Sequence, residues 1–255
     1  MKLDKAIAAV VSGGASGLGA AVARRLASSG LRVAIFDVSE VAGGKIASEI
    51  GGTFHTVDVR DASAVGQAFA AARQAHGQER ICVNCAGIAP SQRTVSKKGA
   101  HDPNLFANVI AINLVGAFNL SSQSAAGMAE LKPLNEDGER GIIVNTASVA
   151  AFDGQIGQIA YAASKAGVAG MTLPMARDLS QLGIRVVAVA PGIFGTPMMK
   201  AMPAEVQAAL AANVPFPKRL GAPEEFASLI DEIVRNPMLN GETIRLDGAI
   251  RMQPK

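Results

Sequence analysis

The chain has 255 residues, a net charge of +3 and a pI near 9.0. Hydrophobic residues make up 49% of it and charged residues 18%, which supplies enough apolar material for a sizeable core and excludes an intrinsically disordered chain. The basic excess is small and contains no run of five basic residues, so we expect no nucleic-acid partner. The length suits one large α/β domain.

Short apolar runs alternate with longer amphipathic ones along the chain. Strands are predicted at Ile7–Val11, Arg32–Phe36, Thr53–Val57, Ile81–Asn84, Gly141–Thr146, Ile184–Ala190 and Thr243–Leu246. Helices are predicted at Leu18–Ser29, Val41–Ile50, Ala62–His76, Leu105–Met128, Gln158–Gln181 and Pro223–Arg235. The strands are apolar without alternation, which is typical of a parallel sheet covered on both faces. We therefore predict an α/β domain with a Rossmann-like, doubly wound, seven-stranded parallel sheet and helices on both faces.

Three segments interrupt this alternation. Residues 90–104 and 130–140 are polar and rich in turn residues, so we interpret them as surface insertions. Residues 195–222 contain four prolines and two adjacent methionines, a composition that favours a flap over a pocket. No linker or shift in composition divides the chain, and residues 1–255 are predicted to form a single domain.

The N-terminus has some features of a signal peptide, because two lysines precede an apolar stretch. The apolar run is short, however, and leads directly into a glycine-rich turn. No stretch reaches the roughly 18 unbroken apolar residues that a membrane-spanning helix needs. We expect a cytoplasmic protein that does not insert into a membrane.

Cys82 and Cys85 form a lone C-x-x-C pattern, which in some proteins binds a metal or carries redox chemistry. If they lie on a strand, residues three apart point to opposite faces and cannot hold one ion. We therefore predict free thiols and no metal site.

The first predicted strand ends in a glycine-rich turn that runs straight into a helix. Glycines here allow a tight turn, let backbone N–H groups approach a pyrophosphate, and let the helix pack on the strand. The helix N-terminus favours the phosphate charge. A plain turn is the alternative, since such a loop alone is a weak signal. The candidate cofactor residues of this turn are Ser12, Gly13, Ser16, Gly17, Leu18 and Gly19.

Carboxylates end the next two strands. Asp37 can accept hydrogen bonds from both hydroxyls of an adenosine ribose and would repel a 2′-phosphate, which predicts NAD rather than NADP. Asp58, followed by Val59, is a candidate contact for adenine. Each aspartate could instead cap the turn or helix that follows it. After the fourth strand, small residues stand where a backbone must pass close to a ligand: Cys85, Ala86 and Gly87.

The strongest pattern in the chain is Ser148 followed by Tyr161 and Lys165. Tyrosine and lysine at i and i+4 share one face of a helix, and a neighbouring ammonium would lower the phenol pKa toward neutrality. Ser148 ends the fifth predicted strand, where its hydroxyl could hold the substrate oxygen. An exposed surface pair is the alternative for Tyr161 and Lys165, although Tyr161 is the chain's only tyrosine. Gln158, one helical turn before Tyr161, is a weaker candidate for substrate contact.

Together these elements resemble the short-chain dehydrogenase/reductase family over essentially the whole chain. Cys85 stands where a second asparagine is usual, and Ser12 where threonine is usual. The resemblance implies that Asn113 holds a proton-relaying water and that Lys165 binds the nicotinamide ribose. It also adds cofactor contacts at Pro191, Gly192, Ile193 and Thr196.

Further runs, among them Asn145–Phe152, Gly170–Pro174 and Ala190–Pro197, resemble the type II 3-hydroxyacyl-CoA dehydrogenases within that family. That resemblance implies a homotetramer that uses NAD to oxidise (S)-3-hydroxyacyl-CoA in fatty-acid or branched-chain breakdown. Three alternatives stay open: an acyl-CoA or acyl-carrier reductase, a steroid or sugar-alcohol dehydrogenase, and an NAD-binding sensor. Lys97, Lys98 and Arg93 in the first insertion could attract CoA phosphates or simply be solvated.

Overall fold

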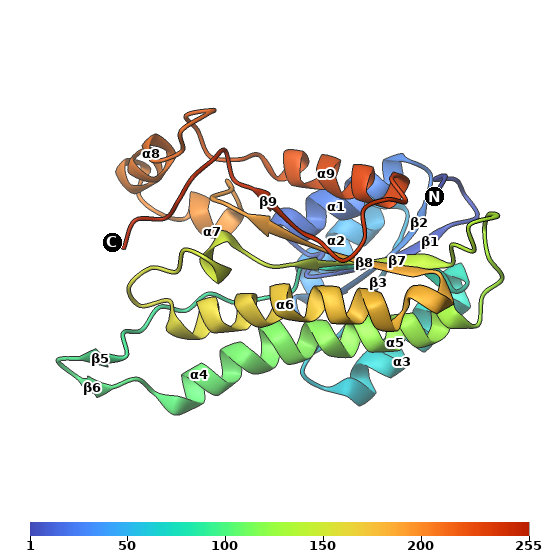
Figure 1. Ribbon diagram of the computed structural model, residues 1–255, viewed down its shortest axis with the longest axis horizontal. Helices are drawn as coiled ribbons and strands as arrows, with labels where there is room; N and C mark the ends of the chain where they lie inside the picture. The colour runs from blue at the N-terminus through green and yellow to red at the C-terminus, as the bar shows by residue number, and fades with distance from the viewer. Residues whose placement is uncertain (255) are drawn as a thin grey trace.

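The central sheet contains seven parallel strands in the order β3-β2-β1-β4-β7-β8-β9 (Figure 1). The computed structural model describes residues 1–254, without the side chains of Met198 and Lys200; Lys255 lies outside the described residues. The strands are β1 Ala8–Ser12, β2 Arg32–Asp37, β3 Thr53–Thr56, β4 Glu79–Asn84, β7 Gly141–Thr146, β8 Ile184–Pro191 and β9 Thr243–Leu246. The chain order reverses direction between β1 and β4, which confirms the predicted doubly wound sheet.

Helices cover both faces of this sheet (Figure 1). On one face lie α1 Gly17–Ser28, α2 Glu40–Ile50 and α9 Pro223–Arg235. On the other lie α3 Ala62–His76, α4 Pro103–Ile110, α5 Gly116–Ala129 and α6 Ile159–Asp178. The side chains beneath them form one large buried cluster on each face, and a smaller third cluster lies under α5 and α6.

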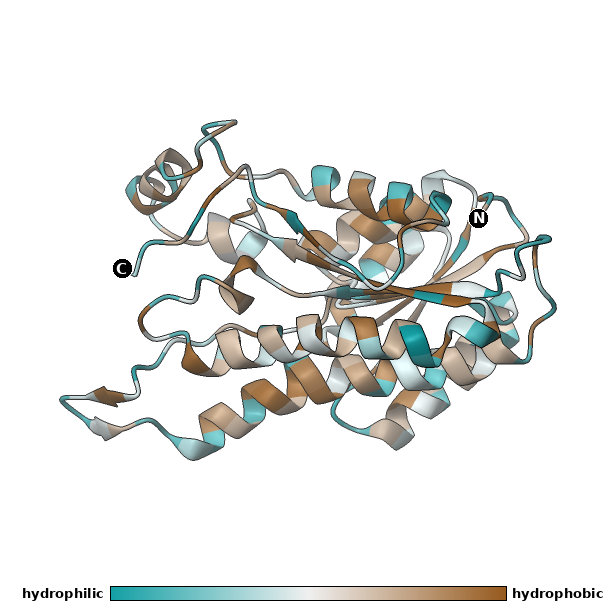
Figure 2. Cartoon of the chain, viewed as in Figure 1, coloured by the Kyte–Doolittle hydropathy of each residue, from teal (hydrophilic) through white to brown (hydrophobic). Residues whose placement is uncertain are grey.

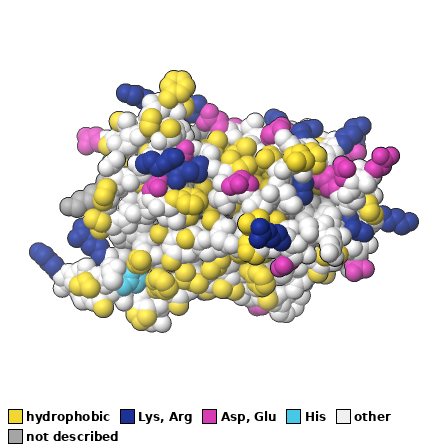
Figure 3. All heavy atoms as spheres, viewed as in Figure 1, with side chains coloured by type: hydrophobic (Ala, Val, Ile, Leu, Met, Phe, Trp, Pro, Cys, Tyr) yellow, Lys and Arg dark blue, Asp and Glu magenta, His cyan; other side chains and the backbone are white. Residues whose placement is uncertain are grey.

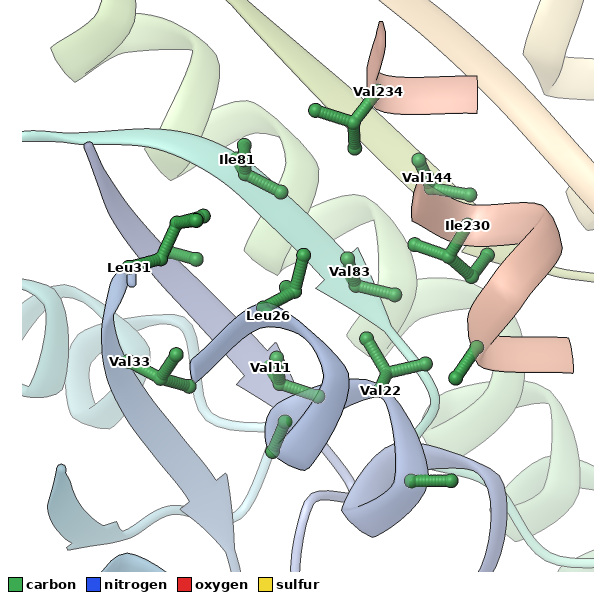
Figure 4. Close-up of a cluster of buried hydrophobic side chains, with 14 of the residues drawn as sticks. Val11, Val22, Leu26, Leu31, Val33, Ile81, Val83, Val144, Ile230 and Val234 are labelled. Carbon is green, nitrogen blue, oxygen red and sulfur yellow. The ribbon is translucent and has the colours of Figure 1, made fainter. Parts of the chain in front are cut away.

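The strand β1 contributes to both large clusters. Val11 packs on the α1 and α9 side, where Figure 4 shows it with Val22 of α1 and Ile230 of α9. Val10, the preceding residue, packs on the α3 and α5 side. Full burial of each such side chain contributes about 1.5–3 kcal/mol, so a shift of one residue in register would be costly. The core therefore fixes where each strand ends.

Two long predicted helices differ from the observed ones in detail. The segment predicted at Leu105–Met128 is a continuous helix from α4 to α5, but residues Ala111–Val115 form a π-helical turn. The segment predicted at Gln158–Gln181 forms α6, and a separate 3₁₀ turn follows at Ser180–Leu182. The spacing of apolar residues in the sequence does not reveal such short π-helical and 3₁₀ turns.

The predicted insertions lie outside the sheet, as expected. Residues 90–104 include a two-stranded hairpin, β5 Val95–Ser96 and β6 Gly99–Ala100, whose four residues are all exposed. Residues 130–140 contain turns and bends. The predicted flap at 195–222 contains two helices, α7 Pro197–Lys200 and α8 Ala204–Ala212, which the prolines had concealed at the sequence level.

The two cysteines lie on opposite faces of the sheet, as the strand geometry predicts. Cys82 belongs to the cluster under α3 and α5, and Cys85 packs against the cluster under α1 and α9. Both thiols are free. Burial raises the pKa of Cys85 to about 11, so its thiol is protonated at neutral pH.

Candidate active site

The carboxyl ends of three neighbouring strands are level with one another. Ser12 pairs with Asn84 across β1 and β4, and Asn84 pairs with Asn145 across β4 and β7. The Asn84 amide also donates a buried hydrogen bond of 2.8 Å to Oδ1 of Asn145. The segments that follow these three strands therefore open onto one edge of the sheet.

The turn after β1 requires glycine at two positions. Gly13 has φ +66°, and a Cβ there would lie 2.6 Å from the amide nitrogen of Ala86. A Cβ on Gly19 would overlap the carbonyl oxygen of Gly13. Ser12 is fully buried and its hydroxyl oxygen accepts a 3.4 Å hydrogen bond from the Ala86 amide, so it ties the turn to the next loop. Because Ser16 makes no side-chain cap, the first amides of α1 are left for an anion.

Asp37 is held at the end of β2 by two backbone amides. Its Oδ2 accepts from Ala15 and its Oδ1 from Ser39, each at 3.0 Å. The first bond joins the carboxylate to the glycine turn. The remaining lone pairs are available to two adjacent hydroxyls, which is the arrangement that a ribose diol needs.

Asp58 forms an ion pair that the sequence reasoning had missed. The Arg60 guanidinium binds both oxygens of Asp58, holds the pKa of that carboxyl below its usual value, and also donates to Asn108 at 2.9 Å. Arg60 follows the expected adenine contacts by only one or two positions, and that proximity was the available signal. Its charge is therefore already engaged by an aspartate.

A cleft of about 480 Å³ runs along this edge. Most of the predicted cofactor residues line it: Gly13, Ser16, Gly17, Leu18, Gly19, Asp37, Asp58, Val59, Cys85, Ala86, Gly87 and Thr196. Lining residues that were not predicted are Phe36, Val38, Val57, Arg60, Ile88, Ile112 and Pro197. Ile193 lines a neighbouring cavity under the flap, and Gly192 packs against Asp247.

This cleft fits a dinucleotide. The glycine turn leaves no room for a Cβ, the start of α1 has uncapped amides, and Asp37 is oriented by backbone bonds. The glycine turn and the uncapped amides suit a pyrophosphate, and the oriented Asp37 carboxylate suits a ribose. The residues that would hold a nicotinamide dinucleotide are thus brought together by the ends of β1, β2, β3 and β4.

Tyr161 and Lys165 lie on α6, facing the same edge. Tyr161 lines a cavity of about 250 Å³ together with Gln158, Gln155 and Ser91. The Lys165 ammonium is buried and donates a 2.6 Å hydrogen bond to the carbonyl of Thr146, the last residue of β7. Its Nζ lies 5.9 Å from the centre of the Tyr161 ring. Gln158, a weaker candidate in the sequence, therefore shares the cavity with the tyrosine.

The pKa values in the protein alone differ from the sequence-based expectation. Burial raises the pKa of Tyr161 above its usual value, and a hydrogen bond with Ser148 opposes that rise. Burial also lowers the pKa of Lys165 to about 8. The predicted lowering of the phenol pKa by Lys165 is thus absent, because the ammonium is itself desolvated and directed at Thr146.

Asn113 sits in the π-helical turn and is almost fully buried. Its Oδ1 accepts from the Ile88 amide at 2.8 Å, and its Nδ2 donates to the Ile88 carbonyl and to Ser164. A Cβ on Gly87 would lie 3.1 Å from that Oδ1 and 3.6 Å from Nζ of Lys165. Asn113 and Lys165 therefore face the same small space, and Oδ1 keeps one lone pair for a water.

Comparison with known proteins agrees with this geometry. A family model described as short chain dehydrogenase matches residues 7–207. The 3-hydroxyacyl-CoA dehydrogenase type-2 of Drosophila melanogaster is 52% identical over 249 residues, which cover 96% of this chain and 97% of that protein. The Homo sapiens protein of the same name is 49% identical over 254 residues, or 98% and 97% of the two chains.

A more distant relative and a solved structure extend the comparison. Ipsdienol dehydrogenase of Ips pini is 33% identical over 249 residues, which cover 95% of this chain and 96% of that protein. The crystal structure of a 3-hydroxyacyl-CoA dehydrogenase type-2 from Mycobacterium avium superposes with a TM-score of 0.94 and 44% identity, covering 100% of both chains.

Proposed function

This chain belongs to the short-chain dehydrogenase family, and we propose on that basis that it oxidises (S)-3-hydroxyacyl-CoA to 3-oxoacyl-CoA with NAD. The observation that carries the proposal is the placement of Tyr161, close to the Ser148 hydroxyl and one helical turn from Lys165, beside a cleft that suits a dinucleotide. The acyl-CoA substrate rests on near full-length similarity to proteins of that name. In this proposal the enzyme acts in the breakdown of fatty or branched acyl chains.

Three side chains act on the substrate hydroxyl in this proposal. Ser148 holds the oxygen that is to become the carbonyl, and Tyr161 takes its proton as general base. Lys165, positively charged below about pH 8, stabilises the phenolate that precedes this transfer. The cleft lined by Gly13, Asp37 and Gly87 would hold the dinucleotide, whose oxidised nicotinamide would supply the hydride acceptor and a positive charge.

The proton leaves Tyr161 through groups that this chain already orders. Lys165 and Asn113 face the same space beside Gly87, and Asn113 is anchored on both sides of Ile88. A water between their polar atoms would continue the path toward solvent. Because Asn113 is fixed by its own bonds, it positions that water without moving during the reaction.

The preference for NAD over NADP follows from the charges at the adenosine end of the cleft. Asp37 is anchored where the ribose hydroxyls would bind, and its negative charge opposes a 2′-phosphate. Arg60 is the cation that lines the cleft there, and it is bound to Asp58 and Asn108. A 2′-phosphate would have to compete with Asp58 for that guanidinium.

We also propose a homotetramer. An apolar groove of about 410 Å³ lies between α5 and α6, lined by residues such as Phe118, Met171 and Leu179. Figure 3 shows hydrophobic side chains gathered over the part of the molecule where Figure 1 places α4 to α6, and Figure 2 colours much of α4 and α5 as hydrophobic. The stretch Pro103–Ala129 is by length and composition apolar enough to cross a membrane, with 33% of its most apolar window buried. Subunit contact would cover this face.

The proposal is tested by absorbance at 340 nm. Purified protein with NAD and (S)-3-hydroxybutyryl-CoA should produce NADH, and the (R)-enantiomer should be at least tenfold slower. Two competing substrates are included: ipsdienol, because a relative is an ipsdienol dehydrogenase, and a hydroxysteroid, because the sequence left that alternative open. Rapid turnover of either alcohol, with none of any 3-hydroxyacyl-CoA, would refute the acyl-CoA assignment.

A further inference from the structure

The loop between β7 and α6 carries part of the substrate cavity but has little core of its own. Residues 152–158 include Gln155, Ile156 and Gln158, which line the cavity beside Tyr161. Ile156 is exposed, and the loop contains glycines at 154 and 157. Contacts from outside the loop must therefore hold it in place.

One such contact is the bond that the Gln92 amide donates to the Gly157 carbonyl at 2.9 Å, and the last residues of the chain make two more. The Ile156 amide donates to the carbonyl of Pro254 at 3.0 Å, and the Gln155 side chain donates to the carbonyl of Gln253 at 2.9 Å. Both bonds involve residues that line the cavity. The C-terminal segment 247–254, here named the C-terminal strap, thus lies along the substrate loop.

Arg245, on β9, joins the strap to the start of the same loop. Its guanidinium donates to Asp153 at 2.7 Å, to Asp247 at 2.8 Å and to the carbonyl of Ile250 at 3.0 Å. It also lies 5.5 Å from the centre of the Phe152 ring. One side chain therefore fixes both the entry to the substrate loop and the turn of the strap.

That turn requires support, because two consecutive residues are left-handed. Gly248 has φ +59° and Ala249, a residue with a Cβ, has φ +66°. Asp247 stabilises the turn by accepting the Ala249 amide at 3.0 Å, while its other oxygen accepts from Arg245. The Gly248 carbonyl in turn accepts from the Phe216 amide of the flap at 3.3 Å. The strap thus contacts both the substrate loop and the flap.

We propose that Arg245 is a positioning residue for substrate, acting through Asp153 and the C-terminal strap to hold the loop 152–158 in its binding conformation. The proposal rests on the proposed function only in naming the substrate that the loop receives. Arg245 touches neither Tyr161 nor the cofactor cleft, so its loss affects substrate binding more than the chemical step.

The test uses Arg245→Met in the full chain, with Arg73→Met as the matched control. Arg73 makes comparable contacts, with two bonds to Glu79, one bond to the Gln123 carbonyl and a ring contact with Phe69, but it does so at the amino end of β4. We expect Arg245→Met to raise KM for (S)-3-hydroxybutyryl-CoA at least tenfold, with kcat and the KM for NAD within threefold. Arg73→Met should leave all three within threefold.

Hydrogen exchange separates failure of this proposal from failure of the proposed function. Without any substrate, amides 152–158 should exchange at least tenfold faster in Arg245→Met than in wild type, and Arg245→Lys should restore part of the protection. Unchanged exchange in this loop would overturn the proposal, as would faster exchange without a rise in KM. If the protein oxidises no 3-hydroxyacyl-CoA, KM is measured instead with whichever alcohol the protein does oxidise.

A second variant covers the case in which Arg245→Met does not fold. Asp153→Asn leaves Arg245 bonded to Asp247 and should raise KM in the same direction. Combined with Arg245→Lys, its effect should be less than multiplicative, because both act through one contact. Fully multiplicative effects would show that Arg245 does not act through Asp153 and would overturn the proposal.

Discussion

At the scale of single residues, burial sets the protonation of the two groups on α6. It keeps the Tyr161 phenol protonated in the protein alone and brings the pKa of Lys165 to about 8. The spacing of Tyr161, Lys165 and Ser148 predicted which residues meet, because helix periodicity and strand ends are local properties. It did not predict the direction in which the Tyr161 pKa shifts, since desolvation depends on what packs around the ring.

Lys165 makes the unfolding free energy depend on pH in a defined direction. Its pKa is about 8 in the fold and 10.5 as a free side chain, so the unfolded chain binds more protons between those values. Folding stability contributed by this group therefore rises with pH across that window, by at most about 3 kcal/mol. The raised pKa values of Cys85 and Tyr161 act in the opposite direction in both proteins, so the Lys165 contribution is measured as a difference. Between pH 7.5 and 10.5, the change in urea unfolding free energy should be more positive in wild type than in Lys165→Met, by about 3 kcal/mol. If the unfolding free energy depended on pH equally in both proteins, the lowered pKa of Lys165 would be contradicted.

Asp37 should determine which dinucleotide is used. Replacing it with serine removes the charge and the acceptors, and one charge-assisted hydrogen bond is worth about 1.5–3 kcal/mol, so kcat/KM for NAD should fall about 10- to 150-fold. The ratio of kcat/KM for NADP to that for NAD should rise. As a control, Asp61→Ser removes a carboxylate at the N-cap of α3, where serine also caps, and should leave the ratio unchanged. If Asp37→Ser left the NADP to NAD ratio of kcat/KM unchanged, a contact between Asp37 and the adenosine ribose would be contradicted.

At the scale of elements, the π-helical turn at Ala111–Val115 is the feature that places Asn113. The sequence predicted one uninterrupted helix, because residues 111–115 contain no proline or glycine that would mark a break. The flap helices α7 and α8 were missed for a related reason, as their flanking prolines read as loop. The strands and α3, in contrast, were close to their predicted bounds because apolar runs and an aspartate cap mark them locally.

Loss of the Asn113 side chain should loosen the loop after β4. Asn113→Ala leaves the Ile88 amide and carbonyl without partners, so exchange at Ile88 should accelerate and kcat should fall about 10- to 100-fold through loss of the ordered proton path. Ser28→Ala, at the exposed end of α1, should change neither quantity. Normal kcat in Asn113→Ala would contradict its role in the proton path.

At the scale of the whole molecule, the doubly wound sheet gathers residues from seven separated strand ends onto one edge. That order was predictable, because repeated strand–helix units with right-handed crossovers allow few alternatives. The C-terminal contacts with the substrate loop were not predictable, since Arg245 and Asp153 lie far apart in the sequence and neither belongs to a periodic pattern.

The apolar groove between α5 and α6 leads to a prediction about the oligomeric state. Light scattering should yield about four times the 26.1 kDa chain mass. Phe118→Glu places a charge in the groove and should produce smaller species, whereas Met238→Glu, at an exposed methionine elsewhere, should not. A monomeric wild-type protein would contradict the tetramer.

The most direct test of the proposed mechanism is the rate of Tyr161→Phe with NAD and (S)-3-hydroxybutyryl-CoA. The variant keeps the ring and its packing but has no proton to exchange, so kcat should fall about 10²- to 10⁴-fold while NADH still binds with wild-type affinity. Binding of NADH by fluorescence confirms that the cleft is intact. A variant that retains more than about a tenth of wild-type kcat would contradict Tyr161 as the general base.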